Sequence, residues 1–369
     1  MRALVSGGAG FIGSAVVERL LGSGASVRVV DRASDGVDTR AELIEGDIVD
    51  EEVCAAAVRG VDVVLHQAAR VGLGKDPEDL PGYVSDNDLG TAMLLRALWR
   101  AGFEGRLVLA SSMVVYGEGR YRCSAHGVVR PGPRSTVDLD AGRFDPPCPS
   151  CGAALTWSLV PEDAPVDPRS VYAATKLAQE HLCASWARQA GASVVALRYH
   201  NVYGPGLPRD TPYAGVASLF LSALLAGEPP RVFEDGAQAR DFVHVDDVAR
   251  ANVLALGVDV PAGGFAPVNV CSGRSTTVLD MAGALASAVS GPCPVVTGEY
   301  RLGDVRHVVA SPERARTLLG FEAGVSFEHG MTELAAEARA ALPRAQADTT
   351  PIDVQAPTSA LRTRTTPTT

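Results

Sequence analysis

In the segment LVSGGAGFIGSAVVERL, residues 4–20, three glycines join an apolar run to a helical pattern. Gly7, Gly10 and Gly13 are spaced Gly-x-x-Gly-x-x-Gly and open the helical pattern. Glycine permits a tight turn and a close backbone approach to a ligand, and a helix N-terminus offers unpaired N–H groups to a phosphate. The segment predicts the strand, turn and helix of a dinucleotide site. The alternative is a glycine-rich turn with a purely structural role.

The next apolar run, SVRVVDR, supports the dinucleotide interpretation. It ends at Asp31, about 20 residues after the glycines, where a carboxylate can bind the adenosine ribose and would repel the 2′-phosphate of NADP. Asp31 therefore favours NAD, and the neighbouring Arg32 weakens that preference. Asp47 and Ile48, in EGDI, are expected to end the following strand beside the adenine.

Apolar runs alternate with helical patterns through the first half of the chain, for example VDVVLHQAA, TAMLLRALWRAG, GRLVLASS and SVVALRYHNVYG. This alternation predicts an α/β fold with a doubly wound parallel sheet, together with a smaller C-terminal substrate-binding lobe and a Cys-rich insertion. We assign residues 1–200 to an NAD-binding Rossmann domain, to which residues 236–260 return. Residues 201–235 and 261–341 form the lobe, and residues 342–369, poor in large apolar side chains, form a disordered tail.

The bulk composition excludes several classes of partner. The chain has 369 residues, 46% of them hydrophobic, and a formal net charge of -10, which argues against a nucleic acid or an anionic membrane as the main partner. Neither a signal-peptide pattern nor an apolar run of transmembrane length is found. Seven cysteines without a secretory signal indicate a reducing compartment, so we expect a cytoplasmic protein.

The segment SVYAATKLAQEHL, residues 170–182, places Tyr172 and Lys176 four residues apart on one helical face. A cation near a phenol favours the phenolate and lowers the pKa of the tyrosine, which would make Tyr172 a usable base. The alternative is an exposed tyrosine and an exposed lysine without a joint role.

Residues 119–168 interrupt the alternation and are rich in Pro, Gly, Arg and Cys. Within them, CSAHG and CPSCG supply Cys123, His126, Cys148 and Cys151 at the spacing of two zinc knuckles. A closed Cys3His site would organise a loop too polar to build its own core. The alternative is a flexible lid with free thiols.

The ordered motifs GGAGFIG, EGDIVD, HQAA, SSMVVYG, YAATK, LRYHNVYGPG and RDFVHVDD resemble the extended short-chain dehydrogenase/reductase family, in particular its nucleotide-sugar epimerases and dehydratases. The resemblance runs from Met1 to about Gly330 and implies NAD as cofactor, a nucleotide-diphosphate sugar as substrate and a homodimer as the assembly. It also implies Ser112, Tyr172 and Lys176 as catalytic residues. The cofactor-binding residues that it implies, together with the glycine pattern, are Gly7, Gly10, Phe11, Ile12, Gly13, Asp31, Arg32, Asp47, Ile48, Ala68 and Lys176.

On the substrate side, the resemblance implies five contacts. Asn201 and Arg240 match positions that bind the diphosphate, and Arg306 supplies a second cation. Phe233 could pack against the base, with ordinary core packing as the alternative. Asn87 matches a position near the active site, although a polar residue near a helix N-terminus explains it as well. For both arginines the alternative is a solvated salt bridge.

The resemblance implies a redox-neutral cycle in which Tyr172 removes a hydroxyl proton while a hydride passes from the same carbon to NAD. Dehydratases of this family carry Asp-Glu directly after the catalytic hydroxyl residue, whereas Met113 and Val114 stand there in this chain and cannot move protons. We therefore expect a 4-epimerase, and the insertion resembles that of enzymes acting on dTDP-L-rhamnose. The alternatives are a UDP-hexose or UDP-uronate 4-epimerase, a 4-ketoreductase and a non-catalytic dinucleotide sensor.

Overall fold

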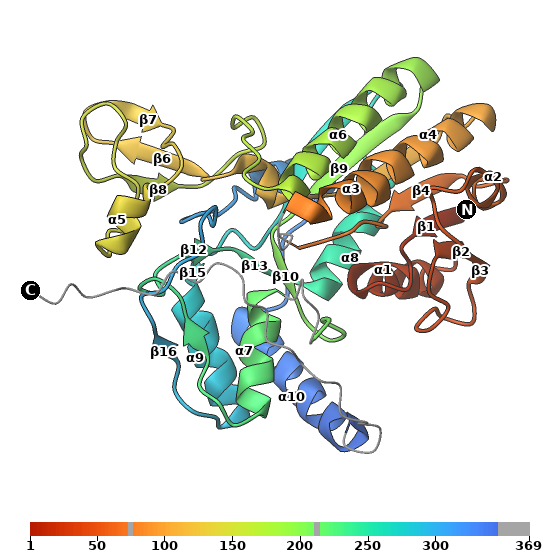
Figure 1. The fold of residues 1–369 in the computed structure, drawn as a ribbon. Coiled ribbons are helices and arrows are strands. Elements are labelled where there is room, and N and C mark those ends of the chain that lie inside the picture. The colour runs from red at the N-terminus through yellow and green to blue at the C-terminus, as the bar shows by residue number, and fades with distance from the viewer. Residues whose placement is uncertain (73–76, 210–214, 346–369) are drawn as a thin grey trace, which may run out of the picture.

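A seven-stranded sheet forms the centre of the molecule (Figure 1). The computed structural model describes residues 1–72, 77–209 and 215–345. Neighbouring strands run parallel in the order β14-β9-β5-β4-β1-β2-β3, which is that of a doubly wound fold, so the predicted fold class is confirmed. The strands are β1 (Arg2–Ser6), β2 (Ser26–Asp31), β3 (Glu42–Glu45), β4 (Val63–His66), β5 (Arg106–Ser112), β9 (Ser193–Tyr199) and β14 (Phe265–Val270).

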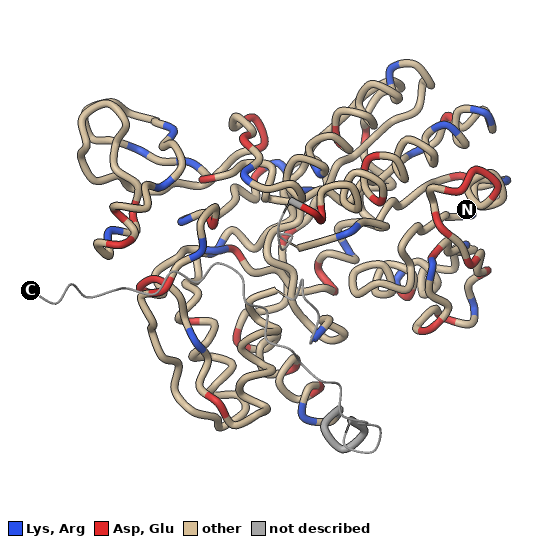
Figure 2. The backbone as a smooth tube through the Cα atoms, viewed as in Figure 1, with Lys and Arg blue, Asp and Glu red and all other residues tan. Residues whose placement is uncertain are grey.

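Helices cover both faces of the sheet because successive side chains of each strand point to opposite faces. In β9, Val195 and Leu197 pack beneath α1 and α8, whereas Val194 and Ala196 pack beneath α2, α4 and α6. Burial on both faces explains the continuous apolar runs of the sequence. Charged residues are spread over the whole chain rather than gathered in one element (Figure 2). The helices are α1 (Phe11–Gly22) and α8 (Val245–Leu254) on one face, and α2 (Glu51–Ala57), α4 (Gly90–Arg100) and α6 (Val171–Ala190) on the other.

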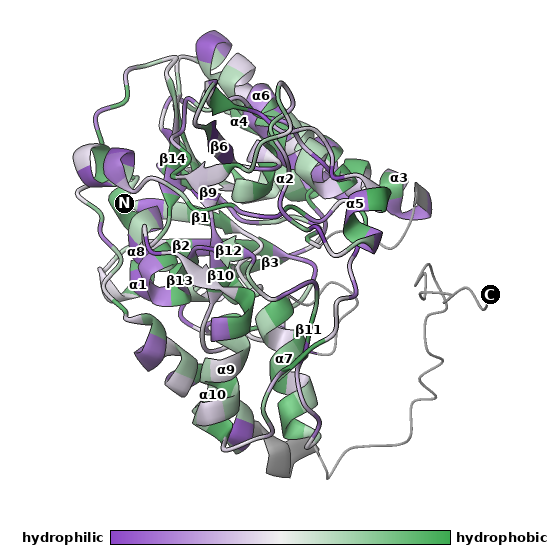
Figure 3. Cartoon of the chain, turned by 90° about the vertical axis from the view of Figure 1, so that its left-hand side faces the viewer, coloured by the Kyte–Doolittle hydropathy of each residue, from purple (hydrophilic) through white to green (hydrophobic). Residues whose placement is uncertain are grey.

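A second core lies in the C-terminal lobe, where α7 (Val216–Leu225), α9 (Val278–Val289) and α10 (Phe327–Ala345) pack together. Hydrophobic residues follow one another along α7 (Figure 3), and α9 begins with a capping box made by Thr277 and Asp280. Three two-stranded sheets lie outside the central sheet. They pair β10 (Asn201–Tyr203) with β13 (Phe242–His244), β11 (Arg231–Val232) with β16 (Val295–Val296), and β12 (Ala239–Arg240) with β15 (Thr276–Thr277).

Short helices flank the carboxyl edge of the sheet. The chain winds through η1 (Pro77–Asp79), α3 (Leu80–Tyr83) and the π-helix η2 (Val84–Leu89) before it enters α4. A π-turn inside a helical run is often found at a functional site. Directly after β5 comes η3 (Met113–Tyr116), and a second π-helix, η4 (Ala315–Leu319), lies elsewhere in the chain.

The insertion forms a small antiparallel sheet, in the order β7-β6-β8, that projects from the body of the molecule (Figure 1). Tyr121, Leu139 and Phe144 are buried within it or at its base, so the insertion has more apolar packing than we expected from its composition. Its elements are β6 (Arg120–Cys123), β7 (Gly127–Val129), α5 (Thr136–Asp140) and β8 (Thr156–Ser158).

The domain boundaries differ from those expected in two respects. Residues 265–270, which we assigned to the lobe, form β14 and pair with β9 at the edge of the central sheet. An edge strand tolerates Pro267, which in the sequence argues against a central strand. Helix α10 continues to Ala345, so the first residues of the expected tail are helical, and the rest of that tail lies outside the described residues.

Candidate active site and insertion

The turn between β1 and α1 has no room for a side chain at Gly7 and Gly13. Gly7 has a φ of 73°, and a Cβ added to it would lie 2.6 Å from the backbone nitrogen of Ala68. A Cβ on Gly13 would lie 1.9 Å from the carbonyl oxygen of Gly7. Gly10 is the N-cap of α1 and makes no side-chain cap, so the N–H groups of the first turn, which includes Phe11 and Ile12, remain available. This turn fits a pyrophosphate, which is what the glycine spacing predicts.

Asp31 lies at the end of β2, beside the glycine turn. Its carboxylate accepts hydrogen bonds from the backbone nitrogen of Ala9 at 2.9 Å and from that of Ala33 at 3.1 Å. These bonds fix the carboxylate at the carboxyl edge of the sheet, where a dinucleotide ribose lies in a doubly wound fold.

The residues expected near the adenine follow β3 instead of ending it, because that strand stops at Glu45. Ile48 is buried and packs against Gly90, and Asp47 lies near the exposed Arg32, with 3.5 Å between the carboxylate and the guanidinium. Their contacts to a cofactor stay a prediction.

Ser112, Tyr172 and Lys176 come together at the carboxyl end of β5. Ser112 is the last residue of that strand, and Tyr172 and Lys176 occupy the first two turns of α6. The Lys176 ammonium donates a 2.8 Å hydrogen bond to the carbonyl oxygen of Ala110 and lies 6.0 Å from the centre of the Tyr172 ring. Ser170 caps α6 by accepting a hydrogen bond from the backbone nitrogen of Ala173 at 3.2 Å. The cap fixes the start of the helix and so the position of Tyr172.

The electrostatics of this group differ from the expectation that Lys176 makes Tyr172 a base. Burial raises the pKa of Tyr172 to about 12, and a hydrogen bond from Ser112 opposes that rise. Burial likewise lowers the pKa of Lys176 to about 8. In the protein alone, therefore, desolvation of the phenol outweighs the hydrogen bond from Ser112 that favours the phenolate. A positively charged nicotinamide beside the phenol would shift the balance toward the phenolate.

A buried amide links the π-helix to the catalytic helix. Asn87 accepts a 2.7 Å hydrogen bond from the backbone nitrogen of Arg70, and its amide nitrogen donates to the carbonyl oxygen of Arg70 at 3.0 Å and to the hydroxyl of Thr175 at 2.9 Å. Asn87 is fully buried and lies inside η2 instead of at a helix N-terminus. These contacts position α6, and a contact between Asn87 and substrate stays a prediction.

Sequence reasoning missed a buried ion pair that anchors α6 to the sheet. Arg198 in β9 donates two hydrogen bonds to the carboxylate of Glu180, at 2.9 and 2.8 Å, and the Ser111 hydroxyl lies 2.5 Å from the same carboxylate. Arg198 also donates a 2.9 Å bond to the Tyr116 hydroxyl. The signal in the sequence is a single arginine within the apolar run SVVALRY.

Three of the residues expected to bind the substrate lie along β10, the turn after β11, and β12. The Asn201 amide donates a 3.1 Å hydrogen bond to the carbonyl oxygen of Asp241. Phe233 is only partly buried, with the Arg301 guanidinium 5.3 Å from the ring centre, so its ring is not enclosed in the core. The Arg240 guanidinium donates to the carbonyl oxygens of Arg306 and Val305, at 2.7 and 2.6 Å. Contacts of these residues with a diphosphate or a base stay a prediction.

Arg306 differs from these three residues because carboxylates surround its guanidinium. Its side chain is 1% exposed and forms ion pairs with Asp145 at 2.8 Å, Glu234 at 2.8 Å and Asp235 at 2.7 Å. The guanidinium therefore joins the insertion to the lobe. A contact with a diphosphate would have to share this guanidinium with the carboxylates, and it stays a prediction.

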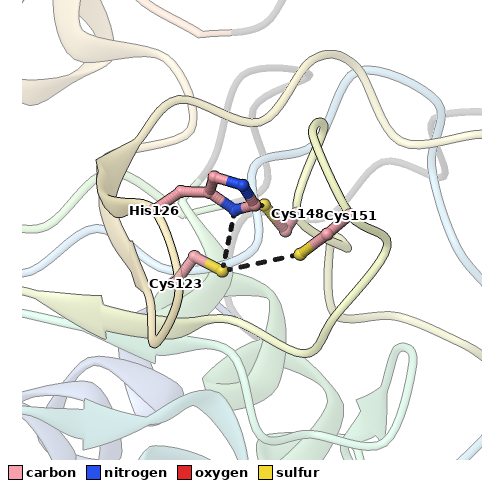
Figure 4. A group of neighbouring side chains, drawn as sticks. All are labelled: Cys123, His126, Cys148 and Cys151. Carbon is pink, nitrogen blue, oxygen red and sulfur yellow. Dashed lines mark hydrogen bonds between the residues drawn. The ribbon is translucent and has the colours of Figure 1, made fainter.

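The four residues of the two knuckles converge on one point (Figure 4). Their ligand atoms, the thiols of Cys123, Cys148 and Cys151 and the imidazole of His126, all lie within 4.8 Å of one another. Cys123 and Cys148 are buried, whereas His126 and Cys151 are exposed.

The doubly wound sheet, the glycine turn at its carboxyl edge and the Ser112, Tyr172 and Lys176 group define an enzyme of the short-chain dehydrogenase/reductase class. A sequence model of the NAD dependent epimerase/dehydratase family matches residues 3–135 and 158–271. The chain belongs to that family, and NAD is its cofactor. The unmatched residues between the two ranges include Cys148 and Cys151.

Individual relatives agree with this assignment. The dTDP-L-rhamnose 4-epimerase of Burkholderia thailandensis is 34% identical over 344 residues, which cover 90% of this chain and 93% of that protein. The UDP-glucose 4-epimerase of Mycolicibacterium smegmatis is 33% identical over 345 residues, covering 90% and 97%. The Thermus thermophilus UDP-glucose 4-epimerase, solved in complex with NAD, is 31% identical and superposes with a TM-score of 0.73 over 92% of this chain and 100% of that one. Among the described residues, no helix has the length and apolar character needed to cross a bilayer.

Proposed function

We propose that this enzyme is a nucleotide-sugar 4-epimerase that oxidises C4 of its substrate to a ketone and then returns the hydride to the opposite face. The observation that carries the proposal is the position of Ser112, Tyr172 and Lys176 at the carboxyl edge of β5, in the sheet that presents the glycine turn. Such a cycle consumes no net cofactor.

Each residue of the group has a distinct role in this cycle. Tyr172, as a phenolate, accepts the proton of the C4 hydroxyl and later returns it, and Ser112 donates a hydrogen bond to the same sugar oxygen. Lys176, held by the carbonyl oxygen of Ala110, orients the cofactor ribose and supplies positive charge near the phenol. NAD, when bound, would supply the acceptor and then the donor of the C4 hydride.

The residues that follow Ser112 support epimerisation over dehydration. Elimination of water needs an additional acid and base, whereas Met113 and Val114 occupy the start of η3. Neither side chain can transfer a proton, so the ketone is expected to be reduced again without loss of water.

For the substrate we propose a dTDP-linked deoxysugar, with dTDP-L-rhamnose favoured. The similarity to the Burkholderia enzyme supports this choice. The alternative is a UDP-hexose or UDP-uronate, supported by the nearly equal similarity to a UDP-glucose 4-epimerase. A 4-ketoreductase would differ from both because it would consume NADH or NADPH stoichiometrically.

We propose two further features of the working enzyme. One is a structural zinc ion on the two knuckles of the insertion. The other is a cytoplasmic homodimer built on α4 and α6, where Trp99 and Leu182 are large apolar side chains that remain 54% and 37% exposed. Sedimentation of the purified protein would test the dimer.

The function can be tested with a panel of dTDP- and UDP-sugars, followed by NMR without added cofactor. We expect inversion at C4, fastest with dTDP-L-rhamnose. The variant Tyr172→Phe should lose turnover by at least about 10²-fold and still contain NAD, because the change removes only the proton-transferring oxygen. Net consumption of NADH would instead favour the ketoreductase, and unchanged turnover by Tyr172→Phe would refute the role of the phenol.

A further inference from the structure

The two knuckles of the insertion repeat one backbone device. Each consists of a cysteine, two further residues, a second ligand and a glycine, in CSAHG (residues 123–127) and CPSCG (residues 148–152). Gly127 and Gly152 both have positive φ values, 68° and 71°, which turn the chain back after the second ligand. Strand pairing aligns Cys123 with Gly127, and the backbone nitrogen of Gly152 bonds to the carbonyl oxygen of Cys148 at 2.8 Å. Two equivalent turns thus point their ligands at each other.

Three of the separations between the ligand atoms match a tetrahedral metal site, and all of the ligand atoms lie within 4.8 Å of one another. Tetrahedral zinc has Zn–S bonds of about 2.3 Å and Zn–N bonds of about 2.0–2.1 Å, which place two sulfurs about 3.8 Å apart and a sulfur and a nitrogen about 3.5 Å apart. The Cys123 and Cys151 sulfurs are 3.7 Å apart, and the Nδ1 atom of His126 lies 3.5 Å from the Cys123 sulfur and 3.6 Å from the Cys148 sulfur. A disulfide would need sulfurs about 2.05 Å apart, so this spacing favours a metal.

Two buried arginines join the insertion to the lobe, and each part of the molecule contributes one of them. Arg134 of the insertion forms a 2.8 Å ion pair with Glu234 of the lobe, and Arg306 of the lobe forms ion pairs with Glu234 and with Asp145 of the insertion. Arg134 also donates a 2.6 Å hydrogen bond to the carbonyl oxygen of Asp304. Asp145 lies only three residues before Cys148, so the knuckle and this contact belong to one short segment.

These contacts lead to the residues expected to bind the nucleotide sugar. Arg240 is held by the carbonyl oxygens of Val305 and Arg306, and Phe233 directly precedes Glu234. A displacement of the insertion would therefore move the carbonyl groups that hold Arg240 and the residue that follows Phe233. The glycine turn and the Tyr172 helix share none of these ion pairs.

We infer that Cys123, His126, Cys148 and Cys151 bind one zinc ion, and that this metal holds the insertion in the shape in which Arg134 and Asp145 fasten the substrate lobe. The zinc closes all four of its positions with protein ligands and takes no part in the reaction. Asp145 and Arg134 act as positioning residues for the lobe. The effect on the substrate rests on the proposed function, whereas the metal site itself does not.

Metal analysis of the full-length enzyme tests the site. We expect about one zinc per chain in the wild type and in the control Cys293→Ser, which changes an exposed cysteine outside the insertion, and a loss of most of that zinc in Cys148→Ser. Cobalt(II) substitution should give the absorption bands of a tetrahedral thiolate site in the wild type and the control. Zinc-free wild-type protein that gives no such bands would overturn the inference. Equal zinc in Cys148→Ser and Cys293→Ser would also do so.

Binding of the nucleotide part of the substrate alone, measured by calorimetry with dTDP and UDP, tests the link to the lobe. In Cys148→Ser and in Asp145→Asn we expect the nucleotide affinity to fall by about tenfold or more while the NAD content stays that of the wild type. In turnover, the loss should appear mainly in KM and less in kcat. Zinc loss with unchanged nucleotide affinity and KM would overturn the link. If no sugar is turned over at all, the proposed function fails, while the metal and nucleotide measurements still decide this inference.

Discussion

The glycine turn makes a sharp prediction for Gly13→Ala, because the methyl group that this change adds has no space. It would lie 1.9 Å from the carbonyl oxygen of Gly7 and 3.0 Å from the Cα of Gly8, and both of these are backbone atoms that cannot rotate away. Comfortable contact needs roughly 3.5 Å, so the turn would have to move by about 1.5 Å. Overpacking of this kind costs about 1–3 kcal/mol, and we expect the upper end because backbone atoms make the clash.

The displaced backbone is the one that should cradle the pyrophosphate, so NAD affinity should fall together with stability. We expect at least about a hundredfold loss, which corresponds to roughly 2.7 kcal/mol. Gly22→Ala is the matched control, since Gly22 lies at the other end of α1 and an added Cβ meets nothing within 4 Å. It should bind NAD normally and gain up to about 0.5–1 kcal/mol. Urea unfolding and NAD titration would measure both variants, and equal behaviour would refute the turn as the cofactor cradle.

Three other outcomes follow from the site. Ser112→Ala removes a hydrogen bond to Tyr172 and should therefore raise the pKa of this tyrosine. The pH–rate profile should then shift to higher pH and turnover at neutral pH should slow by about 10²-fold, whereas an unchanged profile would argue against this role of Ser112. Arg198→Met leaves the Glu180 carboxylate buried without its cation and should lower the free energy of unfolding in urea by about 3–5 kcal/mol. The double variant with Glu180→Leu should recover most of this loss, whereas a small loss in the single variant would mean that the ion pair does not anchor α6. Burial lowers the pKa of Lys176 to about 8, so above that pH the unfolded chain binds a proton that the folded chain has released. Between pH 8 and 10, the free energy of unfolding of the wild type should therefore rise by about 1 kcal/mol per pH unit relative to that of Lys176→Met, whereas a difference that stays constant with pH would show a lysine with an ordinary pKa.

Local patterns in the sequence were sufficient for much of the fold and for the convergence of the site. The glycine spacing, the apolar runs and the Tyr172 and Lys176 pair are short-range features whose geometry follows from one turn or one helix. The spacing of the two knuckles also predicted that Cys123, His126, Cys148 and Cys151 meet, which they do in the structure. Whether they hold a metal stays a prediction.

Features that depend on residues far apart in the chain could not be predicted from local sequence patterns. The residues 265–270 join the central sheet because β9 is available at its edge, and their sequence, with Pro267, does not specify that partner. Arg306 pairs with Asp145 across 161 residues of chain. The pKa of Tyr172 depends on burial by the whole fold. The YAATK segment alone therefore predicted a lowered pKa, whereas the pKa in the protein alone is raised.

The proposed redox cycle fixes the fate of the hydrogen on C4. Epimerisation of dTDP-L-rhamnose, or of the best substrate in the panel, would be run to equilibrium in deuterium oxide and followed by proton NMR. A hydride that leaves C4 and returns from the bound cofactor keeps the original hydrogen, so the C4 epimer should contain no deuterium at C4. Deuterium at that carbon would show that the hydrogen left as a proton, and would contradict the redox cycle assigned to Ser112, Tyr172 and Lys176.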